Sequence, residues 1–176
     1  MTKMGIAAKA PPRKRRRGFD DCYHASYGRL AAQLNAYLGD AAAAEDAVQE
    51  AFLRAWQRWH QISEYEDPVA WIRRVAWNLA TSRWRRIVRE ARLIRHYRGS
   101  DVVEAIGPEN VALVAALRKL HPNHRRVIVL HYLADLPIAE IAAEINVPRG
   151  TVLSWLHRGR AALAAHLTDK KEGEKA

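Results

Sequence analysis

The sequence predicts an all-α protein with two small helical domains joined by a flexible linker. Apolar residues recur every three or four positions through most of the chain, and no segment alternates polar and apolar side chains as a half-buried strand does. The helical pattern stops between 93 and 110, where glycine and proline interrupt it. We therefore expect domains at 19–92 and 111–169, with a disordered basic arm at 1–18 and a charged tail at 170–176.

Composition excludes several classes of protein. Hydrophobic residues occupy 49% of the 176 positions, which suits a globular chain, but no apolar run approaches the ~20 residues that a membrane helix needs. The basic N-terminus is not followed by an apolar segment, so we expect no secretory signal and a cytoplasmic protein. Cys22 is the single cysteine, which excludes an internal disulfide and a cysteine-cluster zinc site. We expect no metal and no cofactor.

The net charge of +10 is distributed unevenly along the chain. Residues 1–18 contain basic residues and no acidic ones, and residues 68–98 contain a single acidic residue among many arginines. Residues 19–67 instead contain more acidic than basic side chains. The basic blocks indicate binding to a polyanion, most simply nucleic acid. For the N-terminal arm alone, a solvated tail is favoured over a specific DNA contact. The acidic block indicates a different partner.

Three helices are expected in the first domain. The first is defined by tyrosines and leucines at helical spacing and ends near Gly39, a residue suited to a left-handed C-terminal position. Asp40 can cap the second helix, and Pro68 suits the first turn of the third. The helices are expected at Phe19–Leu38, Ala42–Trp59 and Pro68–Arg92, with a polar loop at His60–Asp67.

The second of these helices has an unusual outer face. Leu53 is an isolated apolar residue on a side that is otherwise acidic or carries amides. Singly exposed leucines are common on protein surfaces, but a leucine among carboxylates also suits the docking of a basic helical partner. Periodicity alone leaves both interpretations open. The residues that share this face are Asp46, Gln49, Glu50, Leu53 and Gln57.

The third helix combines basic and aromatic residues on the side opposite its apolar stripe. Trp77 and Trp84 lie seven positions apart and therefore on one face. Exposed tryptophans among arginines can stack on unpaired bases, at ~1–3 kcal/mol per base. The alternative is that one or both rings pack under another helix of the domain. The residues predicted to point outward are Arg73, Arg74, Trp77, Thr81, Trp84 and Arg85.

The second domain is predicted to contain a helix-turn-helix. Apolar residues spaced at i, i+3, i+4 and i+7 give residues 138–145 one apolar helix face. Asn146 tolerates the left-handed conformation of a tight turn, and Pro148 suits the first position of the next helix. Two helices at Val111–Leu120 and Pro122–Leu133 are expected to support this pair.

The helix that follows Pro148 has the pattern of a recognition helix. Val152, Leu156 and Leu163 fall within a narrow arc that faces the core. Short polar and basic residues on the opposite side suit the major groove of DNA. An ordinary helical hairpin in a bundle is the alternative. The residues expected at the groove are Thr151, Ser154 and Arg158, with Trp155 at the boundary.

Short motifs occur in a characteristic order in the two predicted domains. Residues 46–56, 71–78 and Arg85-Arg86 lie in the first, and Glu140-Ile141-Ala142, Gly150-Thr151-Val152 and residues 156–160 lie in the second. The first set resembles region two, and the second set region four, of the extracytoplasmic-function sigma factors of bacterial RNA polymerase. Their order, their spacing and the intervening linker make the combination specific over about residues 19–167.

The resemblance implies a role for each surface. The acidic face of the second helix would dock on the clamp helices of the polymerase β′ subunit, and the β subunit is a further expected partner. The polar loop would read a flipped base of the −10 promoter element, the third helix would contact neighbouring DNA, and the recognition helix would read the −35 element. Because the polymerase performs the chemistry, we do not expect an enzyme.

The resemblance assigns residues to each of these partners. Contacts with core polymerase would come from Asp46, Gln49, Glu50, Leu53 and Gln57. Contacts with −10 DNA would come from Ser63, Glu64, Tyr65, Arg73, Arg74, Trp77, Asn78, Thr81, Trp84, Arg85 and Arg86. Contacts with −35 DNA would come from Arg149, Thr151, Ser154, Trp155 and Arg158.

Three residues depart from the family pattern. Trp77 stands where a basic residue is common, Ser82 where aspartate is common, and Trp155 where arginine is common. The −10 and −35 sequences that this chain reads therefore cannot be transferred from relatives.

Two other classes of protein remain as alternatives. The first is a two-domain helix-turn-helix regulator that binds DNA without core polymerase and uses its first domain as a sensor or dimerisation module. An enzyme has less support, because the sequence contains no glycine-rich phosphate loop, catalytic triad or carboxylate pair. The sequence leaves open the promoters, the inducing signal and the presence of an anti-sigma factor.

Overall fold

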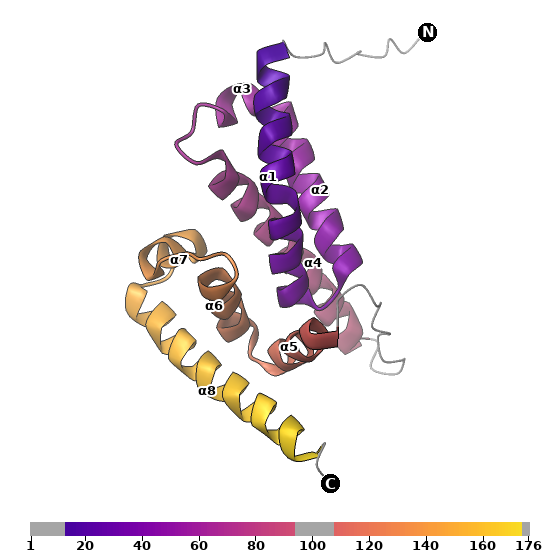
Figure 1. Cartoon of the computed structure of the whole chain (residues 1–176), viewed down its shortest axis with the longest axis vertical. Helices are drawn as coiled ribbons and strands as arrows, with labels where there is room; N and C mark the ends of the chain where they lie inside the picture. The colour runs from indigo at the N-terminus through magenta and orange to yellow at the C-terminus, as the bar shows by residue number, and fades with distance from the viewer. Residues whose placement is uncertain (1–12, 94–107, 174–176) are drawn as a thin grey trace.

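The computed structural model describes residues 13–93 and 108–173, and within them the side chains of residues 18–83 and 112–166. These residues form α-helices and no strand, which confirms the predicted all-α fold (Figure 1). The helices are α1 (Arg13–Leu38), α2 (Ala41–Gln57), α3 (Trp59–Ile62), α4 (Pro68–Leu93), α5 (Pro108–Lys119), α6 (Pro122–Tyr132), α7 (Ile138–Ile145) and α8 (Arg149–Gly173). None of the described helices combines the length and the apolar character that crossing a membrane requires.

The first bundle consists of α1 to α4. α1 and α2 run antiparallel, and α4 packs against both of them (Figure 1). Leu34, Val48 and Ile72, one from each of these three helices, are fully buried in its core. Burial of one such side chain is worth about 1.5–3 kcal/mol. The apolar stripes predicted for the three helices therefore account for the way in which they pack.

Single residues set the helix ends in this bundle. Gly39 adopts a φ of +70° directly after α1, as the sequence predicts. The Asp40 carboxylate accepts a hydrogen bond from the Ala43 amide at 2.9 Å and caps α2. The Asp67 carboxylate accepts one from the Ala70 amide, also at 2.9 Å, at the start of α4. Each cap of this kind is worth ~1 kcal/mol, so both helices have defined starting points.

The second bundle, α5 to α8, contains the predicted helix-turn-helix. Asn146 adopts the left-handed conformation, with φ of 55° and ψ of 54°, between α7 and α8. Pro148 lies just before α8 rather than inside it, and its carbonyl oxygen accepts a hydrogen bond from the Thr151 amide at 3.0 Å. Ile141 of α7 and Val152 of α8 are fully buried and join the two helices to the core.

α1 and α8 extend further than the sequence predicts. α1 begins at Arg13, so the last part of the predicted disordered arm at 1–18 is helical. α8 continues to Gly173 and includes the start of the predicted tail at 170–176. Lysine, arginine and glutamate are good helix formers, and no proline interrupts either segment. Residues 13–18 and 170–173 are therefore helical where the arm and the tail were predicted.

Two predicted connections are also shorter than expected. α3 occupies part of the predicted loop at His60–Asp67, because Trp59 and Ile62 are buried and hold one helical turn against the bundle. α5 begins at Pro108, inside the predicted linker at 93–110. Residues 1–12, 94–107 and 174–176, which include most of the predicted arm and linker, lie outside the described residues.

The two bundles pack against each other. α5 and α6 lie beside the C-terminal end of α1, and α7 lies close to α4 (Figure 1). One cluster of buried side chains extends from Leu34 in the first bundle to Val127 and Leu130 in the second. The sequence predicted two domains but not this contact between them.

Candidate polymerase- and promoter-binding surfaces

The outer face of α2 presents the residues that the sequence groups together. Leu53 is 50% exposed. Asp46, Gln49 and Gln57 are exposed as well, and Glu50 is half-buried. The structure therefore brings these five side chains onto one surface, with the leucine surrounded by carboxylates and amides.

Two ion pairs engage the carboxylates of this face. Glu50 Oε1 lies 2.9 Å from Arg54 Nε one turn further along α2, and Asp46 Oδ2 lies 3.2 Å from Arg83 Nη1 on α4. Ion pairs between exposed side chains are worth only ~0–1 kcal/mol. A basic partner could therefore take over either carboxylate at little cost to the fold.

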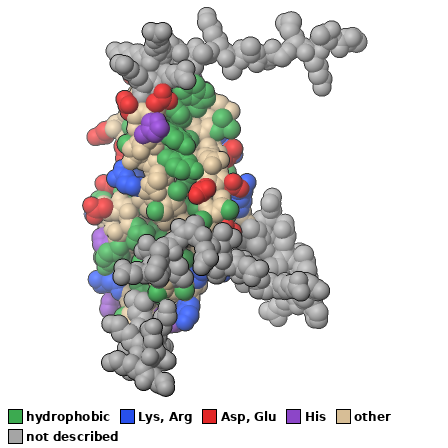
Figure 2. Space-filling model, turned by 45° about the vertical axis from the view of Figure 1, so that its right-hand side comes forward, with side chains coloured by type: hydrophobic (Ala, Val, Ile, Leu, Met, Phe, Trp, Pro, Cys, Tyr) green, Lys and Arg blue, Asp and Glu red, His purple; other side chains and the backbone are tan. Residues whose placement is uncertain are grey.

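Aromatic side chains from α1 and α2 support this face from within. Phe19 meets Trp56 edge-on with ring centroids 4.9 Å apart, and Tyr23 meets Phe52 in the same way at 4.9 Å. Figure 2 shows hydrophobic side chains gathered on the upper half of one side of the molecule, with acidic side chains close to them. Tight packing of this kind keeps the surface of α2 rigid.

The loop between α3 and α4 places three of the predicted −10 residues in solvent. Ser63, Glu64 and Tyr65 are all exposed, and Tyr65 is 48% exposed. The buried side chains of Trp59 and Ile62 anchor the preceding turn. The tyrosine ring is therefore available for stacking and lies on a loop whose start is fixed.

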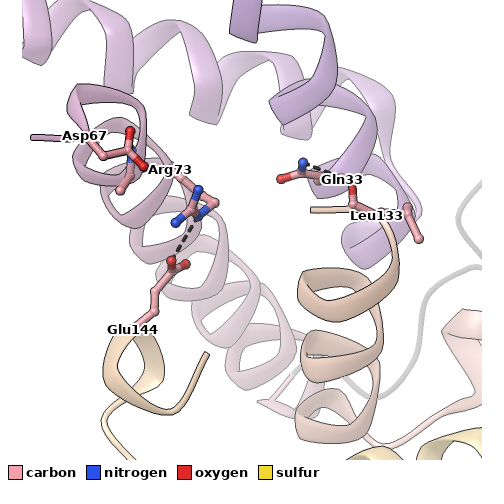
Figure 3. A network of polar contacts seen from close by, with 6 residues as sticks. Gln33, Asp67, Arg73, Leu133 and Glu144 are labelled. Atoms are coloured by element: carbon pink, nitrogen blue, oxygen red, sulfur yellow. Dashed lines mark hydrogen bonds and ion pairs between the residues drawn. The ribbon is translucent and has the colours of Figure 1, made fainter. Parts of the chain in front are cut away.

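Three residues of α4 do not occupy the exposed face that the sequence predicts. Trp77 is fully buried, and Arg73 and Thr81 are buried as well. Thr81 Oγ1 donates a hydrogen bond to the Trp77 carbonyl oxygen at 2.8 Å, while Arg73 pairs with Glu144 of α7. The outward placement was wrong for these side chains. Trp77 packs between Tyr37 of α1 and Arg126 of α6, which is the alternative of burial under another helix, and Arg73 is covered by Glu144 of the second bundle (Figure 3).

The rest of the predicted −10 set divides into two groups. Arg74 and Asn78 are exposed on α4. Trp84, Arg85 and Arg86 belong to α4, but their side chains lie outside those that the structure describes. Stacking by Trp84 therefore stays a prediction.

The recognition helix α8 places its predicted residues at or near the surface. Arg149, Ser154 and Arg158 are exposed, while Thr151 and Trp155 are half-buried. Trp155 packs against the buried cluster, at the boundary position that periodicity gives it. Ser154 and Arg158 are therefore both accessible from solvent on one side of α8.

Two exposed residues of α8 were not singled out from the sequence. Leu153 is 55% exposed, and His157 is exposed one turn later. An apolar residue directly before Ser154, outside the inward arc, was the available signal. Apolar side chains at such positions can contact the methyl group of thymine.

α6 and α8 pack closely against each other. A Cβ added at Gly159 would lie 3.1 Å from Ile128 Cγ1 and 3.3 Å from His124 Cβ, so glycine permits the close approach of the two helices. Burial lowers the pKa of His124, and the neighbouring charges of His121 and Arg158 lower it further. The groove-facing side of α8 is thus fixed by packing on its opposite side.

Comparison with known protein families agrees with this division into two bundles. Residues 22–90 match the family Sigma-70 region 2, and residues 110–163 match the family Sigma-70, region 4. The first match falls on α1 to α4 and the second on α5 to α8. Together they cover most of the chain and define a protein of the sigma-70 class.

Individual relatives narrow this class. The extracytoplasmic-function RNA polymerase sigma factor SigL of Mycobacterium tuberculosis is 34% identical over 177 residues, covering 96% of this chain and 97% of its own. The extracytoplasmic-function RNA polymerase sigma factor SigW of Bacillus subtilis is 32% identical over 148 residues, covering 75% of this chain and 79% of its own. The chain belongs to the extracytoplasmic-function sigma factors of RNA polymerase. A regulator that acts without polymerase is not favoured.

Solved structures share the fold. The sigma factor RpoE of Bartonella quintana, in complex with the anti-sigma factor NepR, matches with a TM-score of 0.75 at 21% identity, over 86% of this chain and 98% of its own. CnrH, in complex with the cytosolic domain of CnrY, matches with a TM-score of 0.64 at 25% identity, over 88% of this chain and 90% of its own. Both matches extend over most of each chain, so the two-bundle fold recurs in solved structures.

Proposed function

We propose that this sigma factor docks on core RNA polymerase through the acidic outer face of α2 and contacts promoter DNA through two separate surfaces. The loop before α4 and the exposed residues of α4 serve the −10 element, and the exposed side of α8 serves the −35 element. Leu53 carries the docking proposal, because this exposed leucine lies within an otherwise polar and acidic face. The protein positions the polymerase, and the polymerase supplies the active site.

The docking surface suits a basic helical partner such as the clamp helices of the β′ subunit. Leu53 would be the apolar anchor, and anchors at the centre of an interface contribute about 2 kcal/mol or more. Asp46 and Glu50 would supply charge complementarity, which speeds association and fixes orientation more than it adds affinity. Gln49 and Gln57 would complete the polar rim, with contacts to the β subunit made elsewhere on the molecule.

The −10 surface combines an aromatic ring with basic and amide groups. Tyr65, on the loop with Ser63 and Glu64, would stack on an unpaired base, an interaction worth ~1–3 kcal/mol. Arg74 and Asn78 would contact the sugar-phosphate backbone and so set the register of the DNA. Arg73 can join this surface only where Glu144 has moved away from it, and the buried Trp77 and Thr81 lie outside this surface.

The −35 surface is the exposed side of α8. Arg158 has the reach and the planar donor pair to contact guanine O6 and N7 in the major groove. Ser154 and Thr151 would contact bases or phosphates nearby, and Arg149 would hold a phosphate beside the start of the helix. Trp155 would support the helix from its edge.

A regulatory protein is a further proposed partner. CnrH was solved with the cytosolic domain of CnrY bound, and this likeness supports the proposal that a partner of the anti-sigma type binds the present chain. The site of action would be the cytoplasm, where polymerase and promoter DNA meet.

The docking proposal is tested by exchanging Leu53 for arginine. Leu53→Arg should weaken binding to core polymerase by about 30-fold or more, corresponding to about 2 kcal/mol, because it removes the anchor and sets a cation against a basic partner. Leu153→Arg is the matched control, since this leucine on α8 is 55% exposed, and it should retain core binding. Fluorescence anisotropy with labelled protein measures both affinities. Equal core binding by Leu53→Arg and wild type, with unchanged helicity, would show that the docking site lies elsewhere.

A further inference from the structure

Leu153 is an apolar side chain on the helix that we assign to the −35 element. It is 55% exposed, the highest value among the large hydrophobic side chains that the structure describes. Val152 and Leu156 on the same helix are buried and join α8 to the core, but Leu153 lies outside their arc. Packing of α8 therefore does not account for an apolar residue at this position. Because singly exposed leucines are common, the neighbours of Leu153 decide its role.

The exposed side of α8 forms an arc with Leu153 at one edge and Arg158 at the other. With 3.6 residues per turn, the exposed side chains of Ser154 and His157 lie between these two edges. Five residues of helix rise by about 7.5 Å, whereas neighbouring base pairs are about 3.4 Å apart. When α8 lies in a major groove, the two edges of the arc therefore meet different base pairs.

Gly150 leaves open space beside Leu153. The two residues are three positions apart on α8 and are therefore neighbours on its surface. A Cβ added at Gly150 would meet no atom within 4 Å, and the φ of this glycine is not positive. Neither packing nor backbone conformation requires glycine here, although glycine is less favourable than alanine in a helix. The missing side chain instead allows a ligand to approach the helix backbone next to Leu153.

The chemistry of this edge of α8 fits the methyl group of thymine. In the major groove thymine presents its C5 methyl group, whereas cytosine presents an amino donor and the purines present polar edges. Leucine offers neither a donor nor an acceptor, so it would leave a polar base edge without a hydrogen bond. Arg149, one turn before Leu153, is exposed and can hold a neighbouring phosphate. A cation for the DNA backbone thus lies beside an apolar contact for a base.

We propose that Leu153 reads a thymine of the −35 element through its C5 methyl group, and that Gly150 provides the space in which this base edge approaches α8. The proposal rests on the function proposed above for α8 and adds a base preference to it. The thymine lies at a different base pair from the guanine contacted by Arg158. Burial of one methyl-sized group changes affinity about fourfold, which a binding measurement resolves.

The test removes the methyl group from the DNA and the leucine from the protein, separately and together. Core polymerase with this protein first selects from duplex promoter fragments that are randomised in the −35 element. Wild type should select thymine at one position where Leu153→Ala does not. Deoxyuridine then replaces this thymine, which removes the methyl group alone. Wild type should bind the deoxyuridine fragment about fourfold more weakly than the thymine fragment, and Leu153→Ala should bind both equally.

A pair of glycine variants tests the role of Gly150. Gly150→Ala adds a methyl group beside Leu153 and should abolish the difference between the thymine and deoxyuridine fragments. Its melting temperature should not fall, because the added Cβ meets open space. Gly28→Ala is the matched control, since this exposed glycine of α1 also has nothing within 4 Å of an added Cβ. Gly28→Ala should retain the fourfold difference, and the same result for Gly150→Ala would exclude Gly150 from the site.

The outcomes separate this proposal from the proposed function. An equal deoxyuridine effect in wild type and Leu153→Ala would assign the methyl contact to another residue and overturn the proposal. Selection of a −35 sequence without a thymine that depends on Leu153, or a thymine whose methyl group does not affect wild-type binding, would also overturn it. In these cases α8 still reads the −35 element, and the proposed function stands. If wild type selects no −35 sequence at all, the −35 role of α8 is overturned as well.

Discussion

Arg158 and Arg160 are both exposed on α8 but differ in what they can reach. Two positions along a helix correspond to a rotation of about 200°, whereas four positions return nearly to the same side. Arg158 therefore shares the side of Ser154, away from the core. Arg160 lies closer to the side of the buried Leu156. Position on the helix, rather than residue type, distinguishes a groove contact from a peripheral charge.

We predict that Arg158 reads a base of the −35 element. Arg158→Ala should cost about 1–3 kcal/mol in binding and relax the preference at one −35 position, because a paired contact to a guanine edge is lost. Arg160→Ala, the control, should leave that preference intact. Binding of the complete polymerase to single-position −35 variants at several salt concentrations measures both effects. A uniform loss across all variants, with a salt slope lowered by about one unit, would instead identify a phosphate contact.

Two of the residues that depart from the family pattern are the tryptophans Trp77 and Trp155. They show what helical periodicity predicts about a single side chain and what it does not. Trp155 is half-buried at the edge of α8, as its angular position predicts. Trp77 is fully buried between Tyr37 of α1 and Arg126 of α6, although periodicity placed it on the outer face of α4. Periodicity identifies the face of a helix, but it does not identify a second domain that covers this face.

At the scale of elements, the most reliable predictions were those with a local cause. Gly39 and Asn146 adopt the left-handed conformations that end α1 and α7, and Asp40 caps α2. α3 was missed because a single helical turn has no periodic signal of its own and is held by the burial of Trp59 and Ile62. The start of α1 and the end of α8 were missed because charged segments can continue a helix.

The packing of α6 on α8 should make the second bundle sensitive to acid. The folded-state pKa of His124 is lowered by burial and by the charges of His121 and Arg158. The stability that neutral His124 contributes to the fold is fully present above the ordinary histidine pKa of about 6.5. It is lost as the pH falls through the lowered folded-state pKa. Protonation of His124 would add a positive charge that is repelled by the charge of Arg158 on α8.

His124→Gln should therefore reduce the loss of thermal stability between neutral pH and a pH below about 6. His157→Gln removes an exposed histidine from α8 and serves as the control. Melting temperatures of the two variants and the wild type at both pH values measure the difference. An unchanged acid sensitivity in His124→Gln would mean that other groups dominate the response.

At the scale of the whole molecule, the arrangement of the two bundles could not be derived from the sequence. The contact uses charged and polar groups such as Arg73, Glu144 and Arg125, which composition assigns to the surface. Their burial depends on long-range pairing between residues far apart in the chain, for which periodicity carries no signal. The unusual tryptophan at position 77 was the one available indication, and it was compatible with stacking on DNA as well.

The contact between the two bundles should couple their unfolding. Loss of a large buried aromatic side chain costs about 3–5 kcal/mol, and Trp77 contacts both α1 and α6. Trp77→Ala should therefore lower the urea midpoint and broaden the transition seen by circular dichroism, whereas wild type should unfold in one steep step.

Tyr65→Ala, which removes an exposed ring from the loop, is the control and should leave the unfolding curve unchanged. Tyr65→Ala should instead weaken promoter opening, and promoter DNA with a pre-melted bubble should relieve this defect. The reason is that a ring that captures separated bases matters less once the strands are already apart. A Trp77→Ala protein with wild-type midpoint and steepness, or one whose promoter defect the bubble repairs, would show that Trp77 acts on DNA rather than between the bundles.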